Sequence, residues 1–431
     1  MMAKLTFALS TILCWFLSLT VATPTLTRRT TRTIPAHGNG TDDTPAILTA
    51  SKECGDGGHI IFTPNTTYHI ATVMNTTALS DVTIDIHGTL LWSTDLDYWL
   101  SNSLSVGYQN QSSAWFLGGS NIHVNGHGIG TLDGNGQAWY DFVQGESNYP
   151  NRPMGLTIWG ANDSTFEGLN FRQSQMWTMA IIHSNNLLMQ DISVNSTSEN
   201  NSPARNTDGA DTLYSNNITM RRWSVDNGDD AIALKGNSTN VLIEDCVFRT
   251  GQGFALGSIG QYEDRVEVIE NVVVRNVTNI ETKYAAYVKT WTGERSGYPP
   301  NGGGGGNGRI RNITITDITL DRGRASPFTI TQCTAFGGVT PGDCDTSTFK
   351  ISDISLTNIK GSVNANTVAI MQCSEAAGGC DDIQIEDVVV QNIGSSANAT
   401  FPNAYRYLCS NVDEPIGFQC TGNGTTNPGG S

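Results

Sequence analysis

Three aspartates near the middle of the chain have the residue type and spacing for acid–base chemistry. Asp208 lies in the stretch NTDGAD, and Asp229 and Asp230 are adjacent in GDDAIALKGN, 21 and 22 residues later. Carboxylates that crowd together raise the pKa of at least one member, which then keeps its proton. A protonated carboxyl can act as a general acid while an ionised one activates water. Hydrolysis of a glycosidic bond requires this combination.

Two polar residues follow the aspartates at comparable intervals. Gln252, in GQGFALGSIGQY, comes 23 residues after Asp229, and Lys289, in YVKTW, comes after a longer interval. If each interval is one coil of a solenoid, we expect the aspartates, Gln252 and Lys289 to form one column on one face. Opposed carboxyl groups roughly 6.5–9.5 Å apart would then give hydrolysis with inversion. The alternative is that the aspartates form turns or bind calcium.

A recurring strand pattern predicts the fold that would place these residues. A polar residue precedes stretches in which polar and β-branched residues alternate, such as NLLMQDISV from Asn186, NITMRRWSV from Asn217 and NVLIEDCVF from Asn240. The repeats start 31 and 23 residues apart, with no helical pattern between them. This predicts an all-β, single-domain right-handed parallel β-helix. A β-sandwich would need periodic tight hairpin turns, which the sequence lacks.

The N-terminal segment predicts export. A lysine followed by an apolar run and a small-residue site predicts a signal peptide over residues 1–22, with a membrane anchor as the alternative. We expect a short pro-segment or linker over residues 23–40 and the β-helix over 41–420, capped by about residues 40–100. Residues 421–431 are expected to form a flexible tail.

Composition agrees with an extracellular protein. There are 24 Lys and Arg against 40 Asp and Glu, a net charge of −16, which argues against a nucleic-acid partner. Thirteen N-x-S/T sequons are candidate glycosylation sites. We expect a secreted monomer with no membrane contact.

Cysteine positions predict local disulfides. Three pairs are close in sequence, which leaves Cys54 and Cys246 either to pair or to stay free. The close pairs are Cys333 and Cys344, Cys373 and Cys380, and Cys409 and Cys420. No cysteine or histidine spacing predicts a zinc site, and we expect no metal or other cofactor.

The segments NTDGAD, GDDAIALKGN, GQGFALGSIGQY and YVKTW resemble the signature segments of glycoside hydrolase family 28, the polygalacturonase family. The resemblance implies inverting hydrolysis of a pectic polysaccharide without a cofactor. It implies that Asp229 is the general acid, that Asp208 and Asp230 hold the attacking water, and that Asn206 supports the site. Lys289 matches a lysine that binds a substrate carboxylate.

Two positions depart from the family pattern. Gln252 stands where the family usually has histidine, and Tyr287 stands where it usually has arginine. Glutamine hydrogen-bonds but cannot titrate, and tyrosine lacks the bidentate clamp for a carboxylate. We expect Tyr287 to contact substrate as a stacking surface, and Lys235, on the strand that follows Asp229, to help bind a uronate.

The sequence is similar to a fungal, exo-acting branch of the family. The main expectation is a galacturan 1,4-α-galacturonidase that cleaves the terminal α-1,4 bond of polygalacturonate. The alternative is an exo-acting rhamnogalacturonan hydrolase or α-L-rhamnosidase on the same fold. A calcium-dependent pectate lyase and a non-catalytic carbohydrate-binding β-helix are two further hypotheses.

Several other residues have two interpretations. The glycine-rich segment 293–308 could wall off one end of a cleft or be a disordered surface loop. Trp291 and Tyr262 could stack on sugar rings or pack against the coils. Arg205 could contact a uronate, and we expect His183 to be structural.

Overall fold

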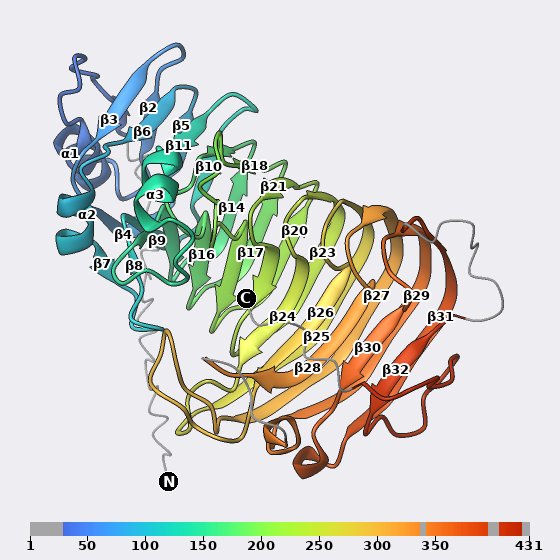
Figure 1. Ribbon diagram of the computed structural model, residues 1–431. Coiled ribbons are helices and arrows are strands. Elements are labelled where there is room, and N and C mark those ends of the chain that lie inside the picture. Colours follow the sequence, from blue (N-terminus) through green and yellow to red (C-terminus); the bar gives the residue numbers. More distant parts are fainter. Residues whose placement is uncertain (1–28, 337–341, 395–404, 425–431) are drawn as a thin grey trace, which may run out of the picture.

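The computed structural model describes residues 29–336, 342–394 and 405–424, which wind into a right-handed parallel β-helix (Figure 1). The predicted fold class is confirmed. The predicted signal peptide, residues 1–22, lies outside the described residues. Within the part of the chain that is described, no helix is long and apolar enough to cross a membrane.

The strands stack in register to form three columns, which we call the first, second and third stacks. The first stack consists of β4 (Met74–Ser80), β9 (Trp115–Ser120), β13 (Leu156–Trp159), β16 (Met179–Ile182), β19 (Ala210–Leu213), β22 (Asp230–Leu234), β24 (Gly253–Ile259), β26 (Ala286–Trp291), β28 (Phe328–Thr334), β30 (Ala369–Gln372) and β32 (Tyr407–Ser410). The second consists of β1 (Thr31–Thr33), β2 (His59–Phe62), β5 (Thr83–Ile86), β10 (His123–Asn125), β14 (Asn162–Glu167), β17 (Asn185–Gln190), β20 (Asn216–Arg221), β23 (Ser238–Arg249), β25 (Val266–Ile280), β27 (Asn307–Gly323), β29 (Lys350–Val363) and β31 (Cys380–Asn392).

The third stack consists of β3 (Thr67–Ile70), β6 (Thr89–Trp92), β11 (Thr131–Asp133), β15 (Asn170–Arg172), β18 (Ser193–Ser196) and β21 (Ser224–Asn227). From β23 onward one long strand pairs with both the second and the third stack. A small separate sheet holds β7 (Leu104–Ser105), β8 (Ser112–Ser113) and β12 (Pro153–Met154). The helices are α1 (Thr44–Glu53), α2 (Leu96–Asn102) and α3 (Gly136–Val143), with 3₁₀ turns at Asp343–Asp345 and Glu375–Ala377.

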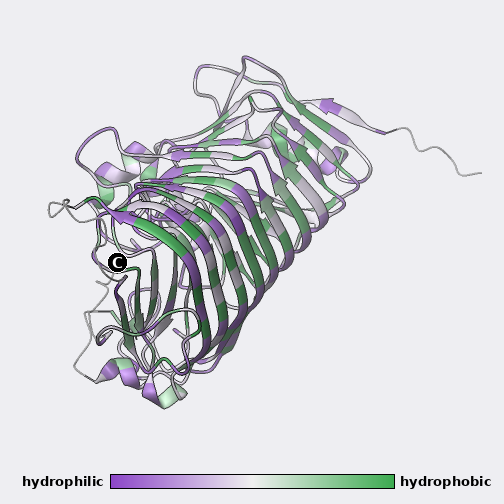
Figure 2. Ribbon diagram, turned by 90° about the vertical axis from the view of Figure 1, so that its right-hand side faces the viewer, coloured by the Kyte–Doolittle hydropathy of each residue, from purple (hydrophilic) through white to green (hydrophobic). Residues whose placement is uncertain are grey.

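Alternation along each strand builds one continuous apolar core. In β31 the side chains of Ile383, Ile385 and Val390 are buried, whereas Val389 is 70% exposed. Figure 2 shows the same alternation of hydrophobic and hydrophilic positions along the stacked strands. Because each coil is thin, its inward side chains pack mainly against equivalent side chains of the coils on either side.

Asparagines at the bend before each repeat strand form a ladder. Asn217 and Asn271 have φ of 56° and 59°, a left-handed conformation that asparagine tolerates better than most residues. Their amides donate to the asparagine one coil earlier, at 3.0 Å from Asn217 to Asn186 and 2.9 Å from Asn271 to Asn240. Asn217 is also a predicted sequon, so its amide nitrogen is already engaged in the folded chain.

The folded body is longer at both ends than the sequence predicted. Thr31–Thr33 pairs with β2 and Ile34 is buried, so the first coil begins inside the predicted pro-segment or linker. At the other end, the N–H of Thr421 donates to the carbonyl of Tyr407 at 2.7 Å, inside the predicted tail. The helix α1 lies at the N-terminal end (Figure 1), and from β2 at His59 onward the residues expected to form the cap already belong to stacked coils.

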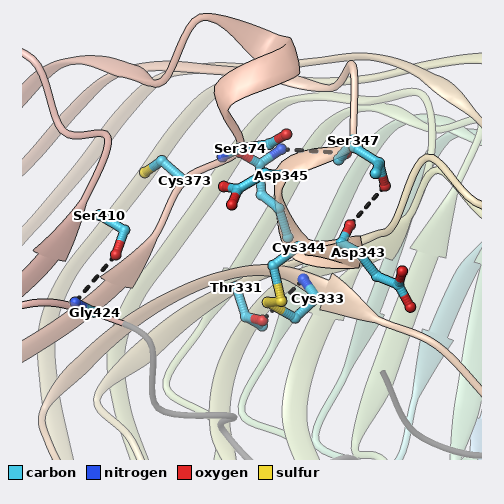
Figure 3. Close-up of a disulfide and its surroundings, with 12 residues drawn as sticks. Thr331, Cys333, Asp343, Cys344, Asp345, Ser347, Cys373, Ser374, Ser410 and Gly424 are labelled. Atoms are coloured by element: carbon cyan, nitrogen blue, oxygen red, sulfur yellow. Dashed lines mark hydrogen bonds between the residues drawn. A yellow bond between two sulfur atoms is a disulfide. The ribbon is translucent and has the colours of Figure 1, made fainter. Parts of the chain in front are cut away.

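All three predicted local disulfides are present and confirm the pairing. They join Cys333 with Cys344, Cys373 with Cys380, and Cys409 with Cys420. Figure 3 shows the first of them in the last coils, beside the N–H of Cys333, which donates to Thr331 Oγ1 at 3.1 Å. Cys54 and Cys246 are free and buried. Burial raises the pKa of Cys246 to about 12, so this thiol is held in its inert, protonated form.

The alternation in β31 gives a direct test of where the core lies. We expect Ile385→Ala to lower the free energy of unfolding by about 2–5 kcal/mol, because it leaves a cavity in the stacked core. Val389→Ala, on the same strand but exposed, should change it by less than about 0.5 kcal/mol. Denaturant titrations of both variants check this, and equal effects would contradict the assigned register.

Candidate active site

The three predicted aspartates meet on the outer face of the first stack. Asp208 lies just before β19, Asp229 lies in the bend between β21 and β22, and Asp230 begins β22. One carboxylate oxygen of each lies within 4.8 Å of those of the other two. The expected separation of roughly 6.5–9.5 Å is therefore wrong for these oxygens, because adjacent coils bring the carboxylates into one tight cluster. Asp208 and Asp230 are buried, and Asp229 is the most exposed of the three.

A local irregularity keeps both adjacent aspartates beside Asp208. The chain bends at Gly228 and Asp229, and the pairing of β22 with β24 shifts register between Asp230 and Ile232. The N–H of Asp230 donates to Asp229 Oδ1 at 3.0 Å. The bend therefore places both carboxylates on the outer face of the first stack.

Asn206 holds Asp229 in place. Its backbone N–H and its side-chain amide donate to Asp229 Oδ2 at 3.1 and 3.4 Å. Its own Oδ1 accepts from the N–H of Asn148 at 2.9 Å. Asn206 therefore lies where the sequence predicted and ties the most exposed carboxylate to the loop that follows α3.

Tyr287 contacts the aspartate cluster directly. Its hydroxyl donates to Asp230 Oδ1 at 2.5 Å, and the residue is 7% exposed. Its ring packs against Tyr284, with centroids 4.8 Å apart. Beyond the substrate-contacting surface that the sequence suggested, the phenol thus also holds a carboxylate.

Gln252 lies against the aspartate pair from the next coil. Its N–H donates to the carbonyl of Asp229 at 2.7 Å, and its own carbonyl accepts from Tyr284 at 3.0 Å. The side-chain oxygen Oε1 is buried and has no hydrogen-bond partner among the described residues. A buried amide oxygen in this state is an acceptor that a bound water or ligand hydroxyl can satisfy.

Lys289 does not continue the column that begins at Asp208. Strand register aligns Lys289 with Gly257, whereas Gln252 immediately precedes Gly253, the partner of Asp230. The prediction of one column is wrong at this residue, because the side chain lies further along the strand than expected. It remains in the field of the cluster: burial lowers the pKa of Lys289, and the charge of Asp230 opposes that shift.

Asp211 belongs to the cluster although the sequence analysis did not select it. It forms an ion pair with Lys235 at 3.2 Å, and both residues are buried. Lys235 Nζ also donates to the carbonyl of Gly257 at 2.9 Å. The ammonium that was expected to help bind a uronate is thus already engaged within the protein. The sequence did hold a signal for it: Asp211 is the second aspartate of NTDGAD and lies in a strand between the uncharged residues Ala210 and Thr212.

Arg152 is a second residue that the sequence did not single out. It is 1% exposed, its Nε donates to the carbonyl of Gln175, and its two terminal nitrogens have no hydrogen-bond partner among the described residues. Burial lowers its pKa to about 10, while the charges of Tyr140, Asp208 and Asp229 act in the opposite direction. This cation therefore offsets part of the negative charge of the cluster.

Burial and mutual repulsion make the cluster proton-binding. Desolvation raises the pKa of Asp211 to about 7 and that of Asp230 to about 6. Desolvation, followed by the charges of Asp211 and Asp229, raises the pKa of Asp208 well above its usual value. The carboxyls titrate as one coupled set, so the cluster retains protons at mildly acidic pH. This is the condition for a proton donor beside an ionised partner.

The remaining candidate residues separate into packing and surface positions. Trp291 is 6% exposed, and the hydroxyl of Tyr262 accepts from the N–H of Gln109 at 2.7 Å, so both pack within the protein. His183 is exposed and stacks on Tyr214 with ring centroids 5.1 Å apart. Arg205 is half-buried just before Asn206.

The segment 293–308 is an ordered loop between β26 and β27. An antiparallel bridge joins Ser296 to Gly303, and Gln261 Nε2 donates to the carbonyls of Pro300 and Gly302 at 3.0 and 2.7 Å. Figure 1 shows the gold segment reaching the N-terminal coils near β7 and β8. We call residues 293–308 the roof loop.

The roof loop meets segments about 150 residues earlier in the chain. Gln261, which holds the loop, accepts from Gln109 Nε2 at 2.5 Å. Asn148 donates its amide to Asn301 Oδ1 at 3.4 Å, and the N–H of Asn148 bonds Asn206. The loop is therefore connected, through two asparagines, to the residue that positions Asp229.

Comparison with known proteins decides the family. The family model described as "Glycosyl hydrolases family 28" matches residues 59–412. The chain belongs to glycosyl hydrolase family 28. It is accordingly a glycoside hydrolase, which sets aside the pectate lyase and the non-catalytic binding protein considered above.

Relatives within family 28 differ in the substrate that their names state. The chain is 50% identical over 388 residues to an alpha-L-rhamnosidase of Aspergillus niger, covering 90% of this chain and 89% of that protein. It is 36% identical over 381 residues to an exopolygalacturonase of Cochliobolus carbonum, covering 88% and 84%.

Solved structures agree on the fold. The endo-xylogalacturonan hydrolase of Aspergillus tubingensis matches with a TM-score of 0.76 and 26% identity, covering 92% of this chain and all of that one. An exopolygalacturonase of Thermotoga maritima matches with a TM-score of 0.68 at 17% identity, covering 92% of each chain, and supports the fold alone.

The raised pKa of Asp211 predicts how stability depends on pH. Its folded-state pKa of about 7 lies above the ordinary value of 3.8 for an aspartate, so the folded chain binds more protons than the unfolded chain between those values. Stability should therefore fall as pH rises from about 4 to 7. In Asp211→Asn, which keeps an acceptor for Lys235, the melting temperature should fall less steeply over this range.

Thermal melts at unit steps of pH measure this slope. Asp264→Asn changes an exposed aspartate and serves as the matched control, which should follow the wild type. A variant at Asp211 that also follows the wild type would show that this carboxyl is not the one whose ionisation opposes folding.

Proposed function

We propose that this protein is a secreted, exo-acting hydrolase of pectic polysaccharides that removes a terminal L-rhamnose from rhamnogalacturonan chains. The observation that carries the choice of sugar is the tyrosine at position 287, where the resemblance to the family leads one to expect arginine. A guanidinium complements the carboxylate of a uronic acid, whereas a phenol ring complements the methyl group of a deoxy sugar.

Relative exposure supports the division of labour among the carboxyls. Asp229 is the most exposed of the three and is held by Asn206, so it is placed to protonate the leaving oxygen. The buried Asp208 and Asp230 would orient and deprotonate the attacking water. Inversion follows if that water attacks from the face opposite Asp229. No cofactor enters these steps.

The surroundings of Asp230 favour a sugar without a carboxylate. Ala233 and Ala255 pack with Tyr284 and Tyr287 into a small apolar cluster on the outer face of the first stack. Because the hydroxyl of Tyr287 is engaged by Asp230, its ring is what a sugar next to this cluster would meet. Lys289, further along the strand, would then face the carboxylate of a neighbouring galacturonate.

Release of a terminal galacturonate is the second candidate. Two cations flank the cluster on the side away from Lys289. Lys283 lies over the ring of Tyr284 at 5.0 Å, and Arg324 donates to the carbonyl of Gly251 at 2.7 Å. Such cations would suit a uronate at the cleaved end, as the name of the exopolygalacturonase relative suggests.

The roof loop supports exo action. Asn301 of the loop contacts Asn148, and Gln261, which holds the loop, contacts Gln109. A cleft closed at one end accepts a chain terminus and excludes the middle of a polymer. The predicted leader supports an extracellular location.

Product identification tests the proposal. Oligosaccharides of rhamnogalacturonan with a terminal rhamnose should release free rhamnose, and oligogalacturonates should release little or nothing. Galacturonate as the first product would establish the second candidate. Long incubation without product on either substrate would overturn both.

The role of Asp229 is tested in the same assay. Asp229→Asn should lower turnover at least ~100-fold, because an amide cannot protonate the leaving group. Its circular dichroism should match the wild type. Near-wild-type turnover would remove Asp229 from the role of general acid.

Loosening the roof loop should change the mode of cleavage. Gln261→Ala removes the side chain that holds both Pro300 and Gly302, so we expect products longer than one sugar to appear on polymeric substrate. Tyr298→Ala changes a side chain that is 72% exposed on the same loop, and should leave the product pattern unchanged. If both variants give the same products as the wild type, the roof loop is not what causes exo action.

A further inference from the structure

Three of the seven histidines gather around one aspartate, on a different stack from the active site. Asp85 is in β5 of the second stack, and His59 is in β2, one coil earlier. His87 directly follows β5, and His127 lies in the turn after β10, one coil later. The residues are 26 to 42 positions apart between coils, which is why no local motif revealed them.

Contacts in this cluster converge on the carboxylate. His59 Nε2 lies 2.6 Å from Asp85 Oδ2, and His127 Nε2 lies 2.8 Å from Asp85 Oδ1. The ring of His87 stacks on that of His127 with centroids 4.2 Å apart and an interplanar angle of 14°. The side chain of Asp85 is 19% exposed, so an ion from solvent can reach it.

His87 is the member that ordinary surface pairing leaves unexplained. No hydrogen bond or ion pair of its ring is recorded among the described residues, and its ring contact is the stack on His127. The stacked imidazoles of His87 and His127 repel each other when both are protonated. A cation bound between their neutral forms would use both rings.

The backbone holds these side chains in position. The N–H of His87 donates to the carbonyl of Phe62 at 3.0 Å. His127 adopts φ of 53°, and its N–H donates to Asn125 Oδ1 at 2.7 Å. Burial opposes ionisation of Asp85, but hydrogen bonds from His127 and His59 lower its pKa overall, so it is anionic over a wide pH range.

We propose that Asp85, His87 and His127 bind one divalent transition-metal ion of the zinc class. One ligand atom of each already lies within 4.8 Å of those of the other two. In a tetrahedral zinc site with ligand bonds of about 2.0–2.2 Å, the ligand atoms are roughly 3.3 Å apart. Side-chain rotations that move these atoms by about 1 Å would therefore complete the site. His59 then holds the second oxygen of Asp85 from outside, and water fills the fourth position.

The ion would cross-link coils that have no covalent staple. All three disulfides lie between Cys333 and Cys420, in the last coils, and none is found among residues 29–332. Asp85 and His87 belong to one coil, and His127 belongs to the next. A metal ion that binds the folded chain but not the unfolded chain stabilises the fold by mass action. Because its ligands lie in two N-terminal coils, the ion would stabilise that half of the solenoid.

Titration calorimetry of the full-length, chelator-treated protein with zinc chloride at pH 7 tests this proposal. His127→Asn removes one ligand while keeping a residue that tolerates positive φ. His123→Asn is the matched control, because His123 lies in β10, directly before the turn that holds His127, and forms an equivalent 2.8 Å contact with Glu167. We expect one zinc per chain in the wild type and in His123→Asn, and at least tenfold weaker binding in His127→Asn.

Further readings decide against other locations. Zinc should raise the melting temperature of the wild type, and binding should weaken at pH 5, where protonated imidazoles no longer coordinate. Equal binding by His127→Asn and His123→Asn would overturn the proposal. So would the absence of binding by the wild type at about 100 µM zinc, a concentration at which only weak surface contacts would remain unoccupied. Binding lost in Asp229→Asn but kept in His127→Asn would place the ion among the catalytic aspartates and would also overturn it.

Discussion

The structure depends on the parallel register that returns the chain to the same place in each coil. Backbone hydrogen bonds hold adjacent strands about 4.8 Å apart, so equivalent residues lie directly above one another. On the inside this aligns isoleucines and valines into one core. On the outside the same register brings Asp208 beside Asp229 and Asp230, and their repulsion cannot be relieved by moving one coil alone.

Neighbouring residues compensate for that repulsion without neutralising it. Lys235 forms an ion pair with Asp211, the phenol of Tyr287 donates to Asp230, and the buried guanidinium of Arg152 acts through its charge on Asp208 and Asp229. Arg152 and Lys235 act on Asp208 through their charges, but neither they nor Tyr287 donate a hydrogen bond to it. One buried carboxylate oxygen of Asp208 has no hydrogen-bond partner among the described residues. At least one acceptor in the cluster therefore lacks a hydrogen bond, and a bound water or sugar hydroxyl would donate it. Unsatisfied buried polar atoms of this kind are typical of functional sites rather than of structural cores.

The sequence predicted the features that are encoded by residues close together along the chain. Alternation gave the strands and the fold, close cysteines gave the disulfides, and the spacing of Asp208, Asp229 and Gln252 gave their stacking. Lys289 was misplaced because the register of β26 on β24 sets it opposite Gly257 rather than Gln252, and the spacing along a longer coil does not reveal that register. Arg152 was missed because a loop delivers it from another coil, and contacts of that kind depend on three-dimensional closure.

If the proposed function holds, position 287 couples recognition of the substrate to the acidity of the site. An arginine there would clamp a uronate and would also hold Asp230 ionised through its full charge. Tyrosine offers a single neutral donor at 2.5 Å, and Asp230 keeps a pKa of about 6 under desolvation. Exchanging one residue for the other would thus change both which sugar fits and at what pH the buried carboxylate ionises. A change of substrate at this position therefore requires a compensating change in the charges around Asp230, and the apolar cluster of Ala233, Ala255 and Tyr284 is where such compensation would have to act.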